Sequence, residues 1–438
     1  MTNPLKIDFL RSVNEAYTHA HRTTHSTNTN TRRLGQQQPR LLVEFGKRIL
    51  KRKDILFVMM LSLIGAGTRI QMDISPLGPS PSFRAEQPTA LPLSEQRPRP
   101  REQEQSQRRL CTAEETRHGA WVPVTLDKPP YIPRASKCYS AEELQNATSW
   151  PYHHWHPYGK TDGLCRFDQW DAAAFCALAH NKTVGIMGDS LSWEHFASLA
   201  GLLGVLVGPH DQLKSNFSDG TPYAQDIPMT HPVCNGTARV GFYRNRYLLY
   251  PKWFLDEVDP DIMVFNTGAH GQSEHELVNG YAYKPGESGM LALIDNLRRY
   301  QEERCRPQGR RCLVLWRTTA PGHPGCANFS APATNVTKME EWIRYDPARY
   351  PGKASSYNWW AFAAQDQVIT DLFDEALRNA SAPRFAFDVL RAYDVNVLRP
   401  DAHVGAKDCL HNCDPGAVDV YSTLLLHLMR LHFQNPQN

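Results

Sequence analysis

The chain has 438 residues, of which 41% are hydrophobic, and ten tryptophans, which suffice for a sizeable buried core in one large domain or two average ones. Its formal net charge of +3 is too small to predict binding to nucleic acid, and much of the basic excess lies near the N-terminus. Composition therefore favours a folded protein with a distinct N-terminal region and no nucleic-acid partner.

The N-terminal residues have the pattern of a cytoplasmic tail followed by a membrane anchor. Residues 1–54 are polar and basic, and we expect them to be disordered. An apolar run begins at residue 55 and extends to residue 74 if Arg69 snorkels. Positive charge before this run favours a type II signal anchor over residues 55–74, with the following chain in the lumen. A cleaved signal peptide and a buried core helix are the alternatives.

Residues 75–110 are rich in Pro, Gln, Arg and Glu, which is typical of an extended, solvated stem. The folded part is predicted to span residues 111–438. Every cysteine lies in this part: residues 111, 138, 165, 176, 234, 305, 312, 326, 409 and 413. Seven Asn-x-Ser/Thr sequons lie there too, at residues 146, 181, 216, 235, 328, 335 and 379. An even number of cysteines together with sequons indicates disulfides and glycosylation in the secretory lumen, and the pairing is left open.

Helical and strand patterns alternate within the folded part. Buried strands are expected at residues 183–187, 262–265 and 312–316, and helices at 171–179, 193–203, 291–303, 359–377 and 418–431. This alternation predicts an α/β fold, a three-layer sandwich with a mostly parallel sheet. In such sheets, sites gather at the carboxyl ends of the strands.

Ser190 lies where the first of these strands ends and a helix begins, in Gly188-Asp189-Ser190-Leu191. Backbone N–H groups at a helix start stabilise an oxyanion, so Ser190 is a candidate nucleophile whose own N–H serves as one donor. Helix capping is the simpler interpretation of a serine at this position.

A base for this serine is found near the C-terminus, in Asp408-Cys409-Leu410-His411. On a loop or a helical turn, Asp408 at this spacing is able to orient His411, which would take the Ser190 proton. Together the three residues predict a serine acyl-ester enzyme.

Five further residues are candidates because they follow predicted strands or lie a few residues after them. Asn266 and Gly268 follow the strand at 262–265, and we expect them to complete the oxyanion site. Arg317 follows the strand at 312–316 and is expected to contact substrate or to brace the loop. His270 and His323 are candidate substrate contacts.

Tyr152-His153-His154-Trp155-His156 raises the question of a metal site. Adjacent side chains of an extended segment point to opposite faces, and no carboxylate accompanies these histidines. Aromatic packing or stacking on sugar is the preferred interpretation, and no metal is expected.

These motifs resemble the PC-esterase superfamily and, within it, the trichome birefringence-like polysaccharide O-acetyltransferases. The matching blocks are residues 111–138, 155–168, 181–191, 265–268, 317–323 and 408–419. The resemblance implies an SGNH/GDSL-like fold in the Golgi lumen, with Ser190, Asp408 and His411 as the triad. It further implies an acetyl donor as co-substrate, for which acetyl-CoA is a candidate, a polysaccharide or glycan acceptor, and no bound cofactor.

The chain departs from the family pattern where Trp193-Glu194-His195 replaces Arg-Asn-Gln, at Ala269-His270, and at Asn412. These changes affect the identity of the acceptor more than the chemistry. Three functions are compatible with the motifs: transfer of acetyl groups to a glycan, hydrolysis of such esters, and glycan binding without activity. Transfer is favoured because the triad residues are present and the membrane anchor suits a Golgi transferase.

Overall fold

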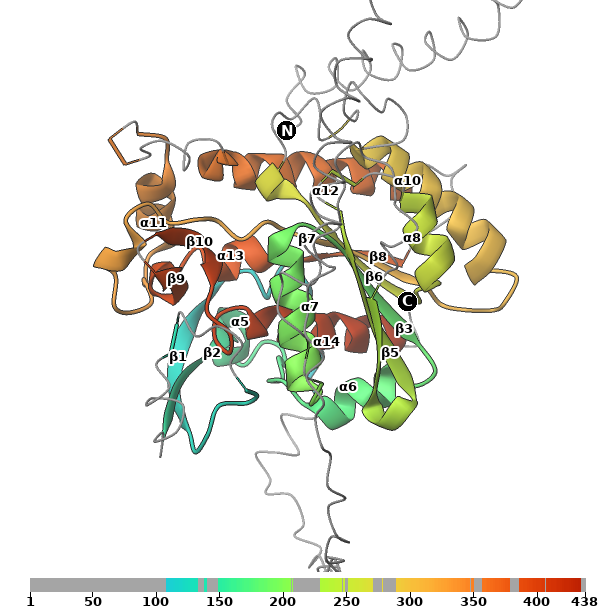
Figure 1. Cartoon of the computed structure of the whole chain (residues 1–438), viewed down its shortest axis with the longest axis horizontal. Coiled ribbons are helices and arrows are strands. Elements are labelled where there is room, and N and C mark those ends of the chain that lie inside the picture. The colour runs from blue at the N-terminus through green and yellow to red at the C-terminus, as the bar shows by residue number, and fades with distance from the viewer. Residues whose placement is uncertain are drawn as a thin grey trace, which may run out of the picture. The chain divides into compact units, whose positions relative to one another are not determined.

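The computed structural model describes part of the chain (Figure 1). The described residues are 108–132, 138–139, 149–205, 207, 229–245, 247–248, 251–270, 278, 289–346, 348–349, 357–378, 386–405 and 407–434. The predicted tail and signal anchor lie outside these residues, as does the predicted stem up to residue 107. No helix within the described ranges combines the length and the apolar composition of a membrane span.

Among the described residues, six strands form a central mixed sheet in the order β4-β5-β3-β6-β7-β8. Their bounds are β3 Thr183–Gly188, β4 Met229–Val233, β5 Ala238–Arg244, β6 Ile262–Asn266, β7 Leu313–Arg317 and β8 Ala386–Leu390. Strands β5, β3, β6, β7 and β8 run parallel, and β4 pairs antiparallel with β5 at one edge. The predicted α/β architecture with a mostly parallel sheet is confirmed.

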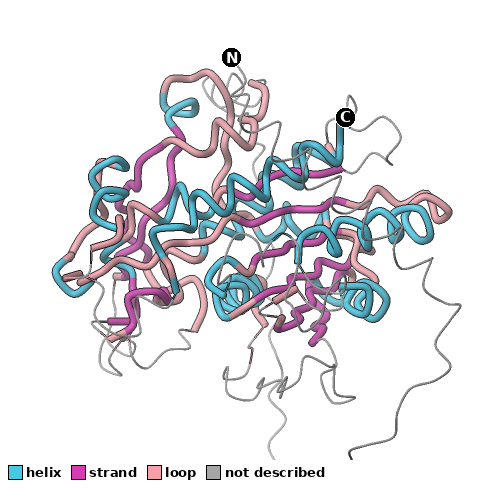
Figure 2. The backbone as a smooth tube through the Cα atoms, turned by 90° about the horizontal axis from the view of Figure 1, so that it is seen from above, coloured by secondary structure: helices cyan, strands magenta, loops and turns pink. Residues whose placement is uncertain are grey.

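Helices cover both faces of this sheet (Figure 2). One face packs against α6 Ala172–Leu178, α7 Ser190–Leu202 and α14 Asp419–Phe433, and the other against α8 Pro251–Val258, α10 Gly289–Tyr300 and α12 Phe362–Arg378. Side chains of β6 alternate between the two cores: Ile262 and Val264 join the first, Met263 and Phe265 the second. A strand buried on both faces explains why its sequence is continuously apolar.

Smaller elements flank the sheet. They are the antiparallel pair β1 Gly119–Leu126 and β2 Trp150–Pro157, the antiparallel pair β9 His403–Gly405 and β10 Asp408–Asn412, and the helices α5 Tyr158–Thr161, α11 Val336–Ile343 and α13 Ala392–Asn396. Single helical turns lie at Cys234–Gly236, Gly268–His270, Gln301–Cys305, Cys326–Asn328, Trp359–Ala361 and Pro400–Ala402. The segment that carries His411 is thus a strand, whereas the sequence led us to expect a loop or helical turn.

The predicted helices and strands are recovered with small shifts at their ends. One shift bears on the site, because the helix expected at residues 193–203 begins at Ser190 instead. Asp189 explains the earlier start, because its Oδ1 accepts the Leu191 N–H at 3.0 Å and so caps the helix.

All ten cysteines lie among the described residues and form five disulfides, which confirms the expectation of oxidised cysteines. The pairs are 111–165, 138–413, 176–234, 305–312 and 326–409. Two of these bonds hold the segment around His411 to distant parts of the chain.

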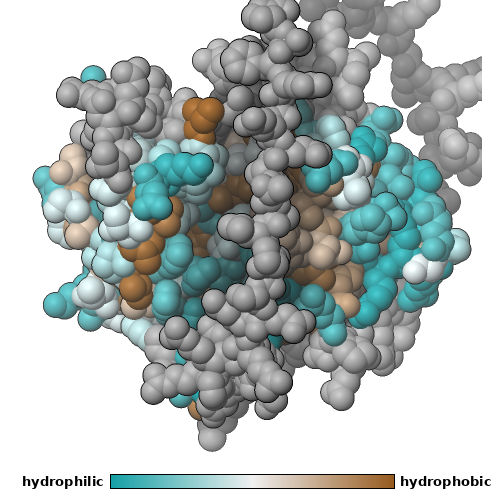
Figure 3. Space-filling model, turned by 90° about the horizontal axis from the view of Figure 1, so that it is seen from below, coloured by the Kyte–Doolittle hydropathy of each residue, from teal (hydrophilic) through white to brown (hydrophobic). Residues whose placement is uncertain are grey.

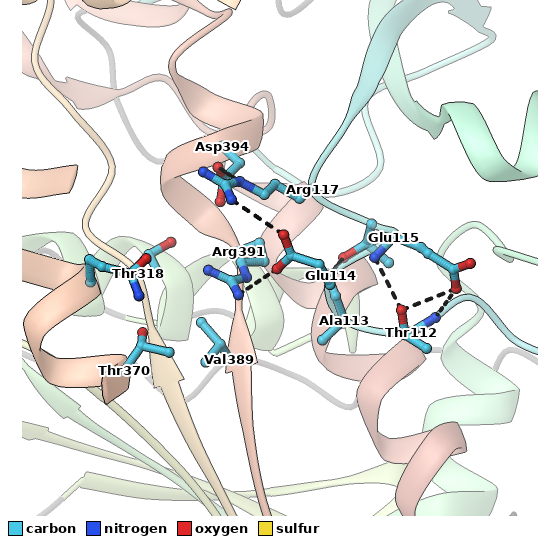
Figure 4. Close-up of polar contacts among 12 residues, drawn as sticks. Thr112, Ala113, Glu114, Glu115, Arg117, Thr318, Thr370, Val389, Arg391 and Asp394 are labelled. Carbon is cyan, nitrogen blue, oxygen red and sulfur yellow. Dashed lines mark hydrogen bonds and ion pairs between the residues drawn. The ribbon is translucent and has the colours of Figure 1, made fainter. Parts of the chain in front are cut away.

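The start of the folded part is tied to a segment near its end by ion pairs (Figure 4). Glu114 lies 2.6 Å from Arg391 and 3.3 Å from Arg117, and Arg117 also donates to Asp394 at 2.6 Å. The Glu114 side chain is 58% exposed, so its two pairs contribute little stability and mainly fix the register of these segments.

Hydrophilic side chains dominate the edges of the face seen in Figure 3, and hydrophobic ones are visible nearer its middle. Among the described residues, the large hydrophobic side chains with the greatest exposure are Ile132 at 67% and Leu164 at 66%. They are isolated in sequence, so they do not by themselves define an interaction surface.

Candidate active site

The candidate nucleophile lies at the tight connection between β3 and α7. Gly188 ends the strand, Asp189 caps the helix, and Ser190 is its first residue. A Cβ atom on Gly188 would lie only 1.9 Å from the main-chain oxygen of Asn266, so this turn packs directly against the end of β6. Glycine is therefore required at position 188 by close approach of two backbones.

Ser190, His411 and Asp408 form one chain of hydrogen bonds. The His411 Nε2 atom lies 2.8 Å from the Ser190 Oγ atom, and His411 Nδ1 lies 3.0 Å from each oxygen of the Asp408 carboxylate. The structure thus brings together side chains 221 residues apart in sequence. Their distances are those that a nucleophile, a base and an orienting group need, and their catalytic roles stay a prediction.

Asp408 is held by its own strand. Its Oδ1 atom accepts the backbone N–H of His411 at 3.2 Å and that of Leu410 at 3.4 Å, in addition to the imidazole. The disulfides of Cys409 and Cys413 flank His411 on either side. The disulfides therefore anchor β10 to distant parts of the chain, and contacts within β10 hold the carboxylate that orients the imidazole.

Electrostatics favour the charged forms of both side chains. Burial is the largest single influence on each and favours the neutral form. The hydrogen bond and positive charge of His411 nevertheless lower the pKa of Asp408 to about 2. The hydrogen bond to Asp408, together with the negative charges of Glu194, Asp408 and Asp189, raises the pKa of His411 to about 9. At neutral pH the two groups form an ion pair, and His411 must lose a proton before it acts as a base.

Asn266 is engaged within the protein. Its Nδ2 group donates to the Arg317 main-chain oxygen at 2.9 Å and to Thr319 Oγ1 at 2.8 Å, and its side chain is fully buried. Both amide hydrogens are therefore used, which argues against the oxyanion role expected for this side chain. Gly268 begins the turn after β6 and packs against Thr319 so closely that a Cβ would lie 1.9 Å from Thr319 Oγ1. Its oxyanion role, like that of the Ser190 N–H, stays a prediction.

Arg317 holds neighbouring polar side chains of the site in place. Its guanidinium is fully buried, donates to Ser192 Oγ at 3.1 Å and to Asn266 Oδ1 at 2.8 Å, and lies 5.2 Å from the centre of the Tyr421 ring. Of the two roles expected for Arg317, these contacts favour bracing over contact with substrate, because no part of the side chain reaches solvent.

The two candidate histidines lie in different surroundings. His323 is fully buried, with Nδ1 2.7 Å from His403 Nε2 and Nε2 2.9 Å from the Val397 main-chain oxygen. Both ring nitrogens of His323 thus face other protein groups, which argues against contact with substrate, and that role stays a prediction. His270 is partly exposed, near the rings of Tyr247 and Tyr357, and stays a candidate.

The aromatic and histidine-rich segment forms strand β2. Trp155 is buried and packs edge-to-face on Trp121, with ring centres 5.6 Å apart. Tyr152 donates its hydroxyl to Asp419 at 2.7 Å. These contacts agree with the expected aromatic packing, and they place part of β2 beside the start of α14.

Sequence reasoning missed a buried carboxylate beneath the site. Asp366, on α12, accepts the Thr319 N–H at 2.6 Å and the Trp316 indole N–H at 3.0 Å, and Thr319 Oγ1 in turn accepts from Asn266. Burial raises the pKa of Asp366 to about 7. Asp366 lies in an amphipathic helix, where an acidic residue is usually solvated. Its part in holding the residues at the end of β7 is therefore visible only from its hydrogen bonds to Trp316 and Thr319.

Asp419, at the start of α14, was assigned no role from its residue type. Its carboxylate accepts hydrogen bonds from Tyr131, Tyr152, Ser198 and the Gly416 N–H, at 2.5 to 2.9 Å. Burial is the largest influence on this group and raises its pKa to about 6, although the hydrogen bonds oppose the shift. Asp419 thereby joins the loop after β10 to α7 and to β2.

Comparisons with known proteins agree with the motifs. No protein-family model matches the chain. Xyloglucan O-acetyltransferase 3 of Populus trichocarpa is 23% identical over 340 residues, covering 69% of this chain and 80% of that protein. Protein trichome birefringence-like 13 of Arabidopsis thaliana is 23% identical over 305 residues, covering 60% and 70%. Protein trichome birefringence-like 19 of Arabidopsis thaliana is 33% identical over 105 residues, covering 22% and 23%.

Proposed function

Since this chain is a divergent member of the trichome birefringence-like family, we propose that it transfers an acetyl group to a hydroxyl of a polysaccharide. The single observation that carries the chemistry is the 2.8 Å contact between His411 Nε2 and Ser190 Oγ. A relative named xyloglucan O-acetyltransferase supports transfer as the reaction class.

In the proposed first half-reaction, Ser190 Oγ attacks the acetyl carbonyl of a donor while His411 takes its proton. The negative oxygen of the tetrahedral intermediate accepts hydrogen bonds from the main-chain N–H groups of Ser190 and Gly268. The intermediate collapses with release of the donor's leaving group, which receives the proton from His411. This leaves an acetyl ester on Ser190.

In the second half-reaction, His411 removes the proton of a glycan hydroxyl, which attacks the acetyl-serine. Collapse of the second intermediate frees the acetylated glycan and returns the proton to Ser190 Oγ. Asp408 keeps Nδ1 protonated throughout and stabilises the imidazolium in both halves. A thioester such as acetyl-CoA is a suitable donor, because its thiol is a good leaving group.

We further propose that the protein is a type II membrane protein of the Golgi, with the catalytic part in the lumen. The basic tail before residues 55–74 supports the orientation, and five disulfides support an oxidising compartment. The sequons of the folded part agree with passage through the secretory pathway.

The test incubates the purified full chain with a donor labelled in its acetyl group and a panel of oligosaccharides. The wild type and Ser149→Ala, which changes an exposed serine, are expected to label a sugar. Ser190→Ala is expected to lose at least about a thousandfold in rate while it stays folded. Release of free acetate without labelled sugar would instead identify an esterase, and a wild-type rate for Ser190→Ala would exclude the serine mechanism.

A further inference from the structure

Glu194 lies on the nucleophile helix α7, four residues after Ser190, so the two side chains share one face of the helix. Its side chain is almost completely buried, at 7% exposure for the residue. Its Oε1 atom accepts the backbone N–H of Asn412 at 3.1 Å, and Asn412 directly follows His411 on β10. Glu194 therefore joins the helix that carries the serine to the strand that carries the base.

We propose that Glu194 is a positioning residue of the serine site: it holds β10 against α7 and places a second negative charge beside His411. The proposal rests on the proposed function, because it assigns Glu194 a part in the same proton transfer.

The charged and titratable groups around His411 come from four directions. Asp408 lies on β10 itself, Glu194 on α7, and Asp189 in the turn before α7, and all three negative charges favour the imidazolium. His403 on β9 has its Nδ1 3.1 Å from the His411 main-chain oxygen, and burial keeps its pKa well below the ordinary value. His403 is therefore neutral where His411 titrates and does not offset the carboxylates.

Arg317, on β7, is a further charged group that Glu194 influences. It is fully buried, and the charges of Asp189 and Glu194 are among those that help to keep it protonated against the effect of burial. The site thus contains one buried cation, Arg317, which donates hydrogen bonds to the neighbouring polar groups. His411 is a second cation whenever its imidazole is protonated. Glu194 is placed to stabilise both.

The chemical effect follows from the proton transfer. When Ser190 gives its proton to His411, positive charge develops on the imidazole between Asp408 and Glu194. A buried carboxylate at this place stabilises that charge, and it also makes the resting imidazole harder to deprotonate at neutral pH. Glu194 should therefore raise the maximal rate and move the rise in activity to higher pH.

A glutamine at position 194 separates the two roles. Its amide oxygen still accepts the Asn412 N–H, but the side chain carries no charge. Glu194→Gln therefore tests the effect of the charge on His411 while the hydrogen bond between α7 and β10 is retained. Aspartate retains the charge on a side chain shorter by one methylene, so Glu194→Asp tests the hydrogen bond to the Asn412 N–H. Glu257→Gln removes one negative charge from an exposed position on α8 and is the matched control.

The experiment measures kcat/KM of the full chain for a chromogenic acetyl ester between pH 5 and pH 10.5. In Glu194→Gln the apparent pKa of the rising limb is expected to fall by about one unit. The plateau at high pH is expected to fall about tenfold, so that the profiles of this variant and the wild type converge or cross at low pH. Glu194→Asp is expected to lose rate with an apparent pKa near that of the wild type, and Glu257→Gln to leave both unchanged.

A Glu194→Gln profile with the wild-type apparent pKa would overturn the electrostatic role of Glu194. A wild-type rate for Glu194→Asp would overturn its role in holding β10 against α7. Should the glutamine variant not fold, as judged by circular dichroism, the aspartate variant still decides the second point. A wild-type rising limb at or below the ordinary histidine pKa of about 6.5 would then overturn the electrostatic role. Ser190→Ala, assayed in parallel, separates failure of this proposal from failure of the serine mechanism, because only the latter leaves Ser190→Ala active.

Discussion

The disulfide between Cys326 and Cys409 should stabilise the fold more than a local disulfide does. It closes a sequence separation of 83 residues, whereas the bond between Cys305 and Cys312 closes only 7. The loss of chain entropy in the unfolded state then corresponds to about 4.5 kcal/mol for the first bond and about 2.4 kcal/mol for the second. Replacing each pair by alanines is expected to reveal a difference of about 2 kcal/mol.

The same two variants should differ in activity. Cys409 lies between Asp408 and His411, and its main-chain oxygen accepts the His323 N–H at 2.8 Å. Without the bond to Cys326, β10 is held by fewer contacts, and a shift of about 1 Å in His411 is enough to lower turnover about a hundredfold. The bond between Cys305 and Cys312 joins the helical turn after α10 to the residue before β7, at the end of that strand opposite Arg317, so its loss should leave turnover unchanged.

Urea unfolding of the wild type and both double-alanine variants, followed by tryptophan fluorescence, gives the two free-energy differences. Acetyl transfer under folding conditions gives the rates. Equal destabilisation by the two pairs would refute the loop-entropy estimate. An equal loss of turnover would show that Cys326–Cys409 has no special part in holding β10.

Two further outcomes follow from the site. Gly188→Ala should stay folded but lose about a hundredfold or more in turnover, because the new Cβ forces the nucleophile turn away from the main-chain oxygen of Asn266. Wild-type turnover in this variant would contradict the close packing of the two backbones. Asp419 has a folded-state pKa of about 6, above its ordinary value of 3.8, so its contribution to stability is present below pH 4 and is lost as the pH rises through 6. Asp419→Asn should abolish about 3 kcal/mol of this pH dependence, measured by urea unfolding between pH 4 and pH 8, and an unchanged pH profile would exclude Asp419 as its source.

The centre of the fold was predictable because its signals are local. Strand β3, the glycine that ends it and the helix that follows lie within about twenty consecutive residues, and each follows from residue type and apolar spacing, whereas the cap proved to be Asp189 and not Ser190. The pairing of Ser190 with His411 was predictable for a different reason: a serine at a helix start and an Asp-x-x-His segment are complementary in chemistry. The alternation of strands and helices predicted the α/β class and the mostly parallel sheet, whereas β4, β5 and β8 were not predicted.

The remaining features depend on partners that are distant in sequence. Asn266 was expected to face the oxyanion, but Arg317 and Thr319, after the neighbouring strand β7, take both its amide hydrogens. His323 was a candidate substrate contact, but it is buried and one of its ring nitrogens faces His403 of β9. The single-residue signals at these positions were the same as for exposed groups. Only the strand order, which the sequence does not reveal, decides which groups meet.

The large separation between Ser190 and His411 has a consequence for how the protein is made. A ribosome produces the nucleophile turn early and the base only near the end of translation, 221 residues later. Helix α14, which packs against α7, is completed later still. Until His411 is made, the growing chain carries a serine that has no proton acceptor. On the proposed mechanism, the Ser190 hydroxyl does not react with activated acyl groups until synthesis is nearly finished.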